Sequence, residues 1–123
     1  MLKMVEMDDR VSLSEQMESH ETPVILANVF KVTPKDVDAF LDAWTADAKV
    51  LKSKPGFVSA QLHRGIQGSM TFLNYAVWES VDAFREAFSD PGFQATFRRY
   101  PDSTVASPHL FRKVLIPGIS AGE

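Results

Sequence analysis

From Pro23 onward, the positions of apolar and polar residues follow two clear periods. Residues 24–32 are mostly apolar and rich in β-branched side chains, which predicts a strand that is apolar on both faces. Thr33 and Pro34 then supply an N-cap and a proline at the first helical position. Apolar residues recur every three or four positions after that, which predicts a helix over 34–53 that ends at Pro55-Gly56. Its apolar stripe consists of Val37, Phe40, Leu41, Trp44, Ala48 and Leu51.

The second half of the pattern predicts two strands, a broken helical region and a last strand. The strands cover 57–64 and 69–78, joined by a loop over 65–68. Ser80 can cap a second helix, which is interrupted at residues 90–92 and followed by a helical turn. We expect a polar loop over 101–108 and a strand over 110–116. The order β-α-β-β-α-β predicts an α+β fold of the ferredoxin-like type.

Pairing across the predicted hairpin assigns side chains to two faces of the sheet. If Arg64 lies opposite Ser69, one face carries Ser59, Gln61, His63, Met70, Phe72, Asn74, Ala76 and Trp78. The other face carries Val58, Ala60, Leu62, Thr71, Leu73, Tyr75 and Val77. Two helices cover only one face of such a sheet, yet both faces are largely apolar. We therefore expect a homodimer in which the uncovered faces of two sheets pack together.

The first 22 residues form an acidic arm. They hold two basic and six acidic residues, a balance of −4, whereas the whole chain has a net charge of −3. Ser12 and Glu15 have the spacing of a capping box, which favours a short helix around 13–19. We interpret the arm as a frayed extension; the alternative is an arm whose methionines pack on a partner subunit. The predicted domain organisation is an arm over 1–22, a folded domain over 23–118 and a tail over 119–123.

Composition narrows the possible functions. The chain has 123 residues, of which 45% are hydrophobic, and these values suit one globular domain. The absence of cysteine excludes disulfides, thiolate nucleophiles and cysteine-ligated metals. The negative net charge argues against a nucleic-acid partner, and no apolar run reaches the ~20 residues that span a membrane. We expect a soluble, cytoplasmic protein with no nucleic-acid or membrane partner.

The face that carries Asn74 and Trp78 is the candidate for a small-molecule pocket beneath the helices. It mixes bulky apolar groups with polar ones, and Asn28 on the first strand shares the side of Leu26 and Phe30. Asn74 either contacts a ligand or is satisfied by its neighbours, and spacing alone does not decide between the two. Trp78 at the end of its strand is a common core position, and His63 is either a proton-transfer group or an exposed polar residue. Asn74 lies about 13 Å along the sheet from the expected partner of His63, so both could reach a ligand of two or three fused rings.

Two sequence segments resemble the antibiotic biosynthesis monooxygenase family. These are Phe72 to Ser80 (FLNYAVWES), with Ala83-Phe84-Arg85 behind it, and Pro55 to Ala60 (PGFVSA). The likeness covers residues 23–116 and is strongest to the cofactor-free anthrone and quinol oxygenases of polyketide pathways. Members are dimeric α/β barrels, so the resemblance implies the same fold and a homodimer.

The resemblance implies a reaction between dioxygen and a carbanion of the substrate, without metal or flavin. By position, Asn74 would hold a substrate oxygen, Trp78 would offer its indole N–H and ring, and His63 would assist proton transfer. The expected substrate-binding residues are Asn28, Phe72, Met70, Gln61, Phe84 and Arg98, with Arg99 as an alternative to Arg98.

Two differences from the family pattern limit which of the family's residue roles we expect in this chain. The tyrosine expected six residues after the tryptophan is Phe84 here, which removes a proton donor. The haem-degrading branch shares Asn28 and Trp78 by position, but its haem-ligating histidine is replaced by Phe97. We therefore expect neither haem nor flavin, and an oxygenase acting on a small aromatic quinol or anthrone. The alternative is a non-catalytic barrel that binds a small hydrophobic aromatic molecule.

Overall fold

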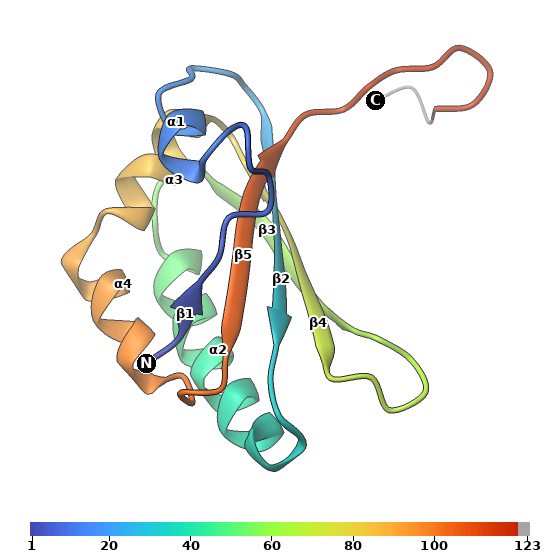
Figure 1. The fold of residues 1–123 in the computed structure, drawn as a ribbon. Coiled ribbons are helices and arrows are strands. Elements are labelled where there is room, and N and C mark those ends of the chain that lie inside the picture. The colour runs from blue at the N-terminus through green and yellow to red at the C-terminus, as the bar shows by residue number, and fades with distance from the viewer. Residues whose placement is uncertain (121–123) are drawn as a thin grey trace.

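A computed structural model describes residues 1–120 and shows one twisted sheet with helices packed against a single face (Figure 1). The sheet has five strands in the order β1-β5-β2-β4-β3. The strands are β1 (Lys3–Met4), β2 (Val24–Lys31), β3 (Phe57–Arg64), β4 (Thr71–Trp78) and β5 (Val105–Phe111). The helices are α1 (Leu13–Gln16), α2 (Val37–Lys52), α3 (Val81–Phe88) and α4 (Pro91–Thr96), with 3₁₀ turns η1 (Pro34–Asp36) and η2 (Phe97–Arg99). Apart from the arm, this is the predicted ferredoxin-like order.

Local sequence signals explain where the helices begin. Ser80 accepts a hydrogen bond from the backbone N–H of Ala83, and Asp90 accepts one from Phe93. Each bond satisfies an N–H that has no partner within its helix. Pro34 and Pro91 open η1 and α4, where a missing N–H costs nothing. The predicted break between α3 and α4 is confirmed.

The buried side chains form two clusters between the sheet and the helices. Phe40 is fully buried near the centre of the first, and its ring lies 5.1 Å from Phe30 and 4.8 Å from Phe72, measured between centroids. Trp78 is fully buried in the second, edge-on to Phe57 and Phe84. Aromatic pairs at these separations contribute roughly 0.5–1.5 kcal/mol each beyond the burial of their area.

The hairpin register differs from the prediction and changes which β3 residues face the helices. Arg64 lies opposite Phe72 and Leu62 opposite Asn74, with a β-bulge between Phe57 and Ser59. The connection is longer than predicted: the N–H of Gly65 donates to the carbonyl of Thr71, and Gln67 and Gly68 have positive φ angles. Because the register beyond the bulge moves by an odd number of residues, the β3 side chains from Ser59 to Arg64 change face. Ala60 and Leu62 now lie on the helix side, where they bury apolar surface.

The last strand also begins earlier than predicted, at Val105 rather than Leu110. Residues 105–111 pair antiparallel with β2, and Pro108 lies opposite Asn28. A proline is tolerated there because β1 pairs only with Val105 and Ala106, so the other edge of β5 is open beside Pro108. Residues 112–120 leave the sheet and extend away from the body (Figure 1). Part of the predicted tail, residues 121–123, lies outside the described residues.

The interpretation of the N-terminal arm as a frayed extension is wrong. Strand β1 pairs parallel with β5, and Leu2 is buried in the core. The capping box at Ser12 and Glu15 is confirmed, although α1 is shorter than expected. Gln16 accepts from the N–H of Leu110 and donates to its carbonyl, both at 2.9 Å. Together with the pairing of β1 with Val105 and Ala106, these bonds fix the arm to β5 near both ends of that strand. Packing of the arm methionines on a partner subunit stays a prediction.

Candidate functional site

An apolar pocket lies between the sheet and the helices and passes under the arm. Its wall comprises Leu2, Met4, Leu26, Asn28, Phe30, Trp44, Asp47, Ala48, Leu51, Phe57, Ala60, Asn74, Ala76, Trp78, Phe84, Phe88, Phe93, Phe97, Ala106 and Pro108. Only Asn28, Asn74, Trp78 and Asp47 bring polar side-chain atoms to this wall. An apolar pocket with a few converging polar groups has the character of a small-molecule site.

Two asparagines occupy the middle of the pocket floor. Asn28 on β2 and Asn74 on β4 are direct cross-strand partners, which places their Cβ atoms about 4.5–5.5 Å apart on the same face. The Oδ1 atoms of both residues are buried and have no hydrogen-bond partner in the protein. A buried polar atom without a partner costs about 1–3 kcal/mol. The two neighbouring carboxamides can therefore bind a ligand through hydrogen bonds.

Trp78 supplies a third buried polar atom at the end of β4. Its indole Nε1 has no partner, although the side chain is fully buried. Phe84 lies edge-on to the indole with centroids 5.9 Å apart, so the wall there contributes no hydrogen-bonding group. The Nε1–H is a donor only, and it can bind an oxygen atom of a ligand.

Asp47 on α2 is a pocket residue that the sequence reasoning missed. Its carboxyl is buried, and the Tyr100 hydroxyl donates to Oδ2 at 2.6 Å. Burial raises the pKa of Asp47, and the hydrogen bonds of Thr96 and Tyr100 and the charge of Arg99 oppose that rise. A signal was present in the sequence, because Asp47 stands three residues after Trp44 and four before Leu51, within the apolar stripe of the helix.

The structure brings together four of the predicted site residues: Asn74, Trp78, Asn28 and Phe84. It does not bring His63 or Gln61 to them, because the hairpin register turns both onto the outer face, where they are exposed. The His63 ring Nδ1 lies 3.4 Å from the carbonyl oxygen of Leu73. The expectation that His63 and Asn74 share one face is wrong.

The other predicted binding residues lie elsewhere. Phe72 is buried in the aromatic core against Phe40 rather than in the pocket wall. Met70 is half-buried in the connection before β4, and Arg98 is exposed in η2, as is Arg99. No positive side chain lines the pocket, so an anionic substrate group finds no ion-pair partner in its wall. Within residues 1–120, no group of three or more His, Cys, Asp or Glu side chains is placed to hold a metal ion.

The arm forms one rim of the pocket. Leu2 and Met4 line it from β1, and Met4 is the one exposed residue of the wall. The backbone of the arm is anchored independently of these side chains, since Lys3 donates to Thr104 and Val5 to Ala106, both at 2.9 Å. The side chains of Leu2 and Met4 thus limit access to the pocket, while the backbone bonds hold β1 against β5.

Replacing both Leu2 and Met4 with alanine should open this rim. We expect a polarity-sensitive dye such as ANS to bind faster and fluoresce more strongly, because apolar wall becomes accessible while the backbone bonds of β1 remain. Stopped-flow fluorescence measures the association rate. Met7→Ala is the control, since Met7 belongs to the arm but not to the pocket. Equal rates in all three proteins would contradict a rim formed by Leu2 and Met4.

Comparisons with known proteins agree with this architecture. A family model described as antibiotic biosynthesis monooxygenase matches residues 23–99. Among solved structures, SnoaB from Streptomyces nogalater, a cofactor-independent oxygenase, is similar with a TM-score of 0.71 and 26% identity, covering 80% of this chain and 99% of SnoaB.

Two curated relatives match over shorter stretches. An uncharacterised protein of Synechocystis is 25% identical over 91 residues, and deoxynogalonate monooxygenase of Streptomyces nogalater is 37% identical over 54 residues. These matches cover 74% and 44% of this chain. The chain spans 62% and 46% of the lengths of these two relatives. No helix within residues 1–120 is long and apolar enough to cross a membrane. The match of the family model over most of the folded body shows that the chain belongs to the antibiotic biosynthesis monooxygenase family.

Proposed function

We propose that the protein is a cofactor-independent monooxygenase that oxidises a small aromatic quinol or anthrone to a quinone with dioxygen. The observation that carries the proposal is the set of buried polar atoms without protein partners: Asn28 Oδ1, Asn74 Oδ1 and Trp78 Nε1. Each of these residues lines a pocket whose wall is apolar apart from them and Asp47. A planar aromatic ring suits the apolar wall, and its oxygen substituents suit the amides and the indole.

The proposed reaction draws its electrons from the substrate and uses dioxygen as the oxidant. The electron-rich substrate loses a proton to the solvent, and its anion passes an electron to dioxygen. The substrate radical and superoxide recombine to a peroxide anion, which takes up a proton to become the hydroperoxide. Loss of water then leaves the quinone carbonyl. Negative charge develops on the substrate oxygen in the first step, so fixed donors around that oxygen stabilise the transition state.

The residues of the floor have distinct tasks in this scheme. The amide of Asn74 holds the substrate oxygen, and Asn28 beside it holds the same oxygen or its neighbour on the ring. Trp78 donates its indole N–H to an oxygen at the other end of the pocket floor, about 13 Å along β4 from Asn74. The apolar wall excludes water, which strengthens these hydrogen bonds.

Oxygen consumption tests the proposal directly. Protein freed of metal and flavin is mixed with a panel of anthrones and hydroquinones, and oxygen uptake and quinone absorbance are followed together. We expect uptake well above the uncatalysed rate, with one quinone formed per dioxygen consumed. Binding of the ring compounds without uptake above the uncatalysed rate would favour a non-catalytic binding barrel, the alternative that the apolar Phe84 supports.

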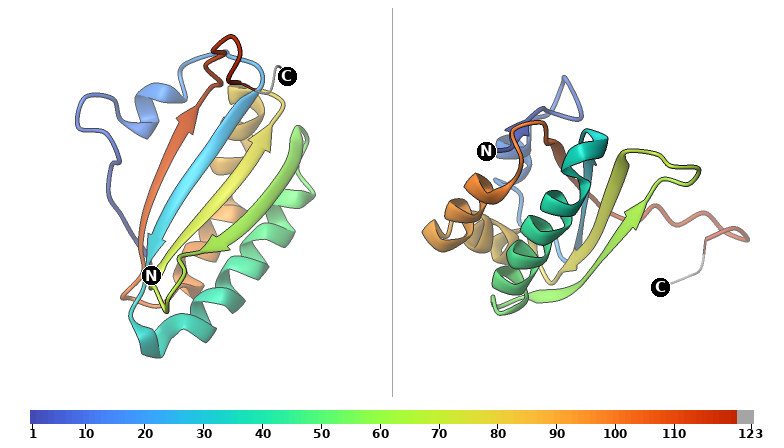
Figure 2. Two further views of the ribbon diagram at one scale, coloured as in Figure 1. Left: turned by 90° about the vertical axis from the view of Figure 1, so that its right-hand side faces the viewer. Right: turned by 90° about the horizontal axis from the view of Figure 1, so that it is seen from below.

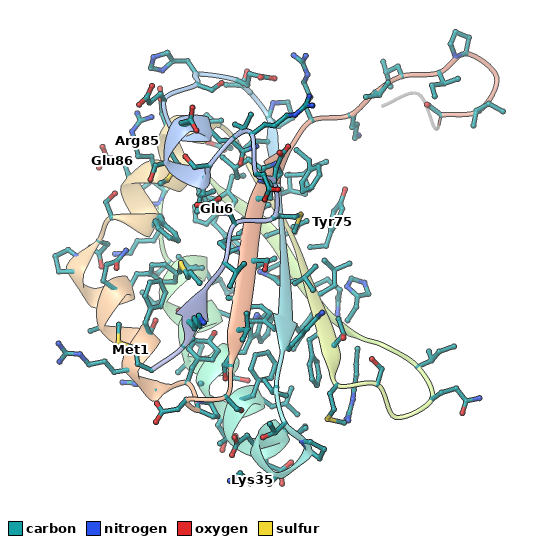
Figure 3. All side chains as sticks on the ribbon, viewed as in Figure 1. Met1, Glu6, Lys35, Tyr75, Arg85 and Glu86 are labelled. Carbon is teal, nitrogen blue, oxygen red and sulfur yellow. The ribbon has the colours of Figure 1, made fainter. Side chains whose placement is uncertain are left out.

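We also propose that the active form is a homodimer in which two sheets pack face to face. The face of the sheet away from the helices carries Ile25, Ala27, Val29, Leu73, Tyr75, Val77 and Val105. None of these side chains is fully buried, and 41% of Tyr75 is exposed. No helix covers this face (Figure 2, left), and Tyr75 points away from the helix layer (Figure 3). The apolar stripe on β2 and β4 is flanked by Ser107 and His109 on β5 and by Gln61 and His63 on β3. Such a stripe is covered most simply by a second copy about a two-fold axis.

A further inference from the structure

Asp47 is the single titratable side chain in the wall of the pocket. It is 8% exposed and approaches the pocket from α2, opposite the sheet that carries the two asparagines. The groups that act on it are Thr96, Tyr100 and Arg99, all from α4 and the segment that follows it. Arg99 itself is exposed and forms no hydrogen bond with the carboxyl group among the contacts of Asp47.

Three short oxygen–oxygen contacts around Asp47 indicate how many protons this group of side chains holds. The Thr96 hydroxyl oxygen lies 2.6 Å from Asp47 Oδ1 and 2.6 Å from the carbonyl oxygen of Phe93. The Tyr100 hydroxyl lies 2.6 Å from Asp47 Oδ2. Each contact joins two oxygen atoms and needs a proton between them, but the two hydroxyl groups supply only one proton each.

A proton on the Asp47 carboxyl group supplies the third. When Asp47 is protonated on Oδ1, it donates to Thr96, Thr96 donates to Phe93, and Tyr100 donates to Oδ2. When Asp47 is ionised, Thr96 has one proton for two acceptors, Asp47 Oδ1 and the carbonyl oxygen of Phe93. The two acceptors must then share that proton. Burial raises the pKa of Asp47, a change that favours the neutral form over the charged one, and burial is also the largest cause that keeps the proton on the Tyr100 phenol.

We propose that Asp47 is held as a neutral carboxylic acid and donates the proton that completes oxygen–oxygen cleavage in this pocket. The proposal rests on the proposed monooxygenase function. Phe84 occupies the position in which the resemblance implies a tyrosine proton donor, and a phenyl ring has no proton to give. Asp47 lines the same pocket, and its proton, which is donated to Thr96 at rest, transfers to the peroxide oxygen when the substrate occupies the pocket.

Cleavage of the hydroperoxide conserves atoms and electrons. The hydroperoxide on the substrate carbon loses its distal oxygen: the O–O bond breaks, and the departing hydroxide takes the Asp47 proton to form water. The electron pair of the C–H bond on the same carbon forms the C=O bond of the quinone. The proton released from that carbon returns to the Asp47 carboxylate, so the acid is regenerated and dioxygen is the oxidant.

Asp47→Asn tests this role with little change in packing. The asparagine amide can donate to Thr96 and accept from Tyr100, which reproduces the hydrogen-bond pattern of the neutral acid without a transferable proton. We expect oxygen uptake to continue while quinone formation falls roughly 10²- to 10⁴-fold, the usual contribution of a general acid. The hydroperoxide should accumulate and be detectable by mass spectrometry. Asp42→Asn, an exposed aspartate on the same helix, is the control and should behave as wild type.

The outcomes separate this proposal from the proposed function. Unchanged quinone formation in Asp47→Asn, or an equal fall of oxygen uptake and quinone formation, would overturn proton donation by Asp47. No oxygen uptake by the wild type would instead overturn the proposed function.

A second measurement does not depend on turnover. Infrared spectroscopy of the wild type at neutral pH should show the C=O stretch of a protonated carboxylic acid. That band should be lost in Asp47→Asn and kept in Asp42→Asn. Its absence from the wild type would overturn the assignment of Asp47 as a neutral acid.

Discussion

Asn74→Ala is expected to lower turnover of the aromatic substrate about 10²- to 10³-fold, equivalent to about 2.7–4 kcal/mol of transition-state stabilisation. The amide sits mid-strand and is 7% exposed, with an Oδ1 atom that no protein group satisfies. The Nδ2–H group of the amide donates to the substrate oxygen, and this hydrogen bond strengthens as negative charge develops there, so the loss falls on catalysis more than on binding. Steady-state oxygen uptake gives kcat, and titration of indole fluorescence under anaerobic conditions gives the dissociation constant.

The test compares the change in kcat with the change in the dissociation constant. We expect the dissociation constant to change less than about tenfold, since the apolar wall supplies most of the binding energy. Gln94→Ala is the control, because it removes an exposed carboxamide from α4, outside both the pocket wall and the proposed dimer face. Equal losses in kcat and in affinity would assign Asn74 to binding alone and would favour the non-catalytic alternative.

Leu73→Lys is expected to weaken the proposed homodimer by about 100-fold or more. Leu73 lies opposite Val29 near the middle of the apolar outer face. A lysine there places one positive charge from each protomer in the interface. Repulsion between these like charges and the loss of apolar burial both oppose association. Analytical ultracentrifugation over a range of protein concentrations measures the change. The monomer should remain folded, because a half-exposed sheet position tolerates a lysine stem.

Thr45→Lys provides the control for charge, since it adds the same charge at an exposed position on α2. It should sediment as the wild type does. A wild-type protein that stays monomeric at all concentrations would contradict the dimer proposal, as would a Leu73→Lys variant that associates as strongly as the wild type.

The hairpin shows where inference from the sequence fails. The two strands were predicted within a few residues, because alternation and turn residues are local signals. Their register was not, because the six residues between Arg64 and Thr71 can close a turn in more than one way. The register that forms buries Ala60 and Leu62 and exposes His63 and Gln61, a choice made by contact with the helices.

Asp47 and the arm were missed for a related reason. A single aspartate in an amphipathic helix is normally a solvated residue, and only the approach of Thr96 and Tyr100, 49 and 53 residues later, shows that it is buried and paired. The arm has an acidic, polar composition that is typical of an extension. It packs on the body because the open edge of β5 offers backbone partners to β1.

Short-range patterns in the sequence therefore determined the elements and their order, the apolar stripe of α2, the asparagine in mid-strand and the likeness to the family. Periodicity, capping and turn residues act within a few positions, so they can be read along the chain. Only the tertiary structure decided which residues meet in the pocket. Register, strand-edge pairing and the burial of a carboxyl depend on contacts between segments far apart in sequence, and burial of apolar surface selects among several locally acceptable arrangements.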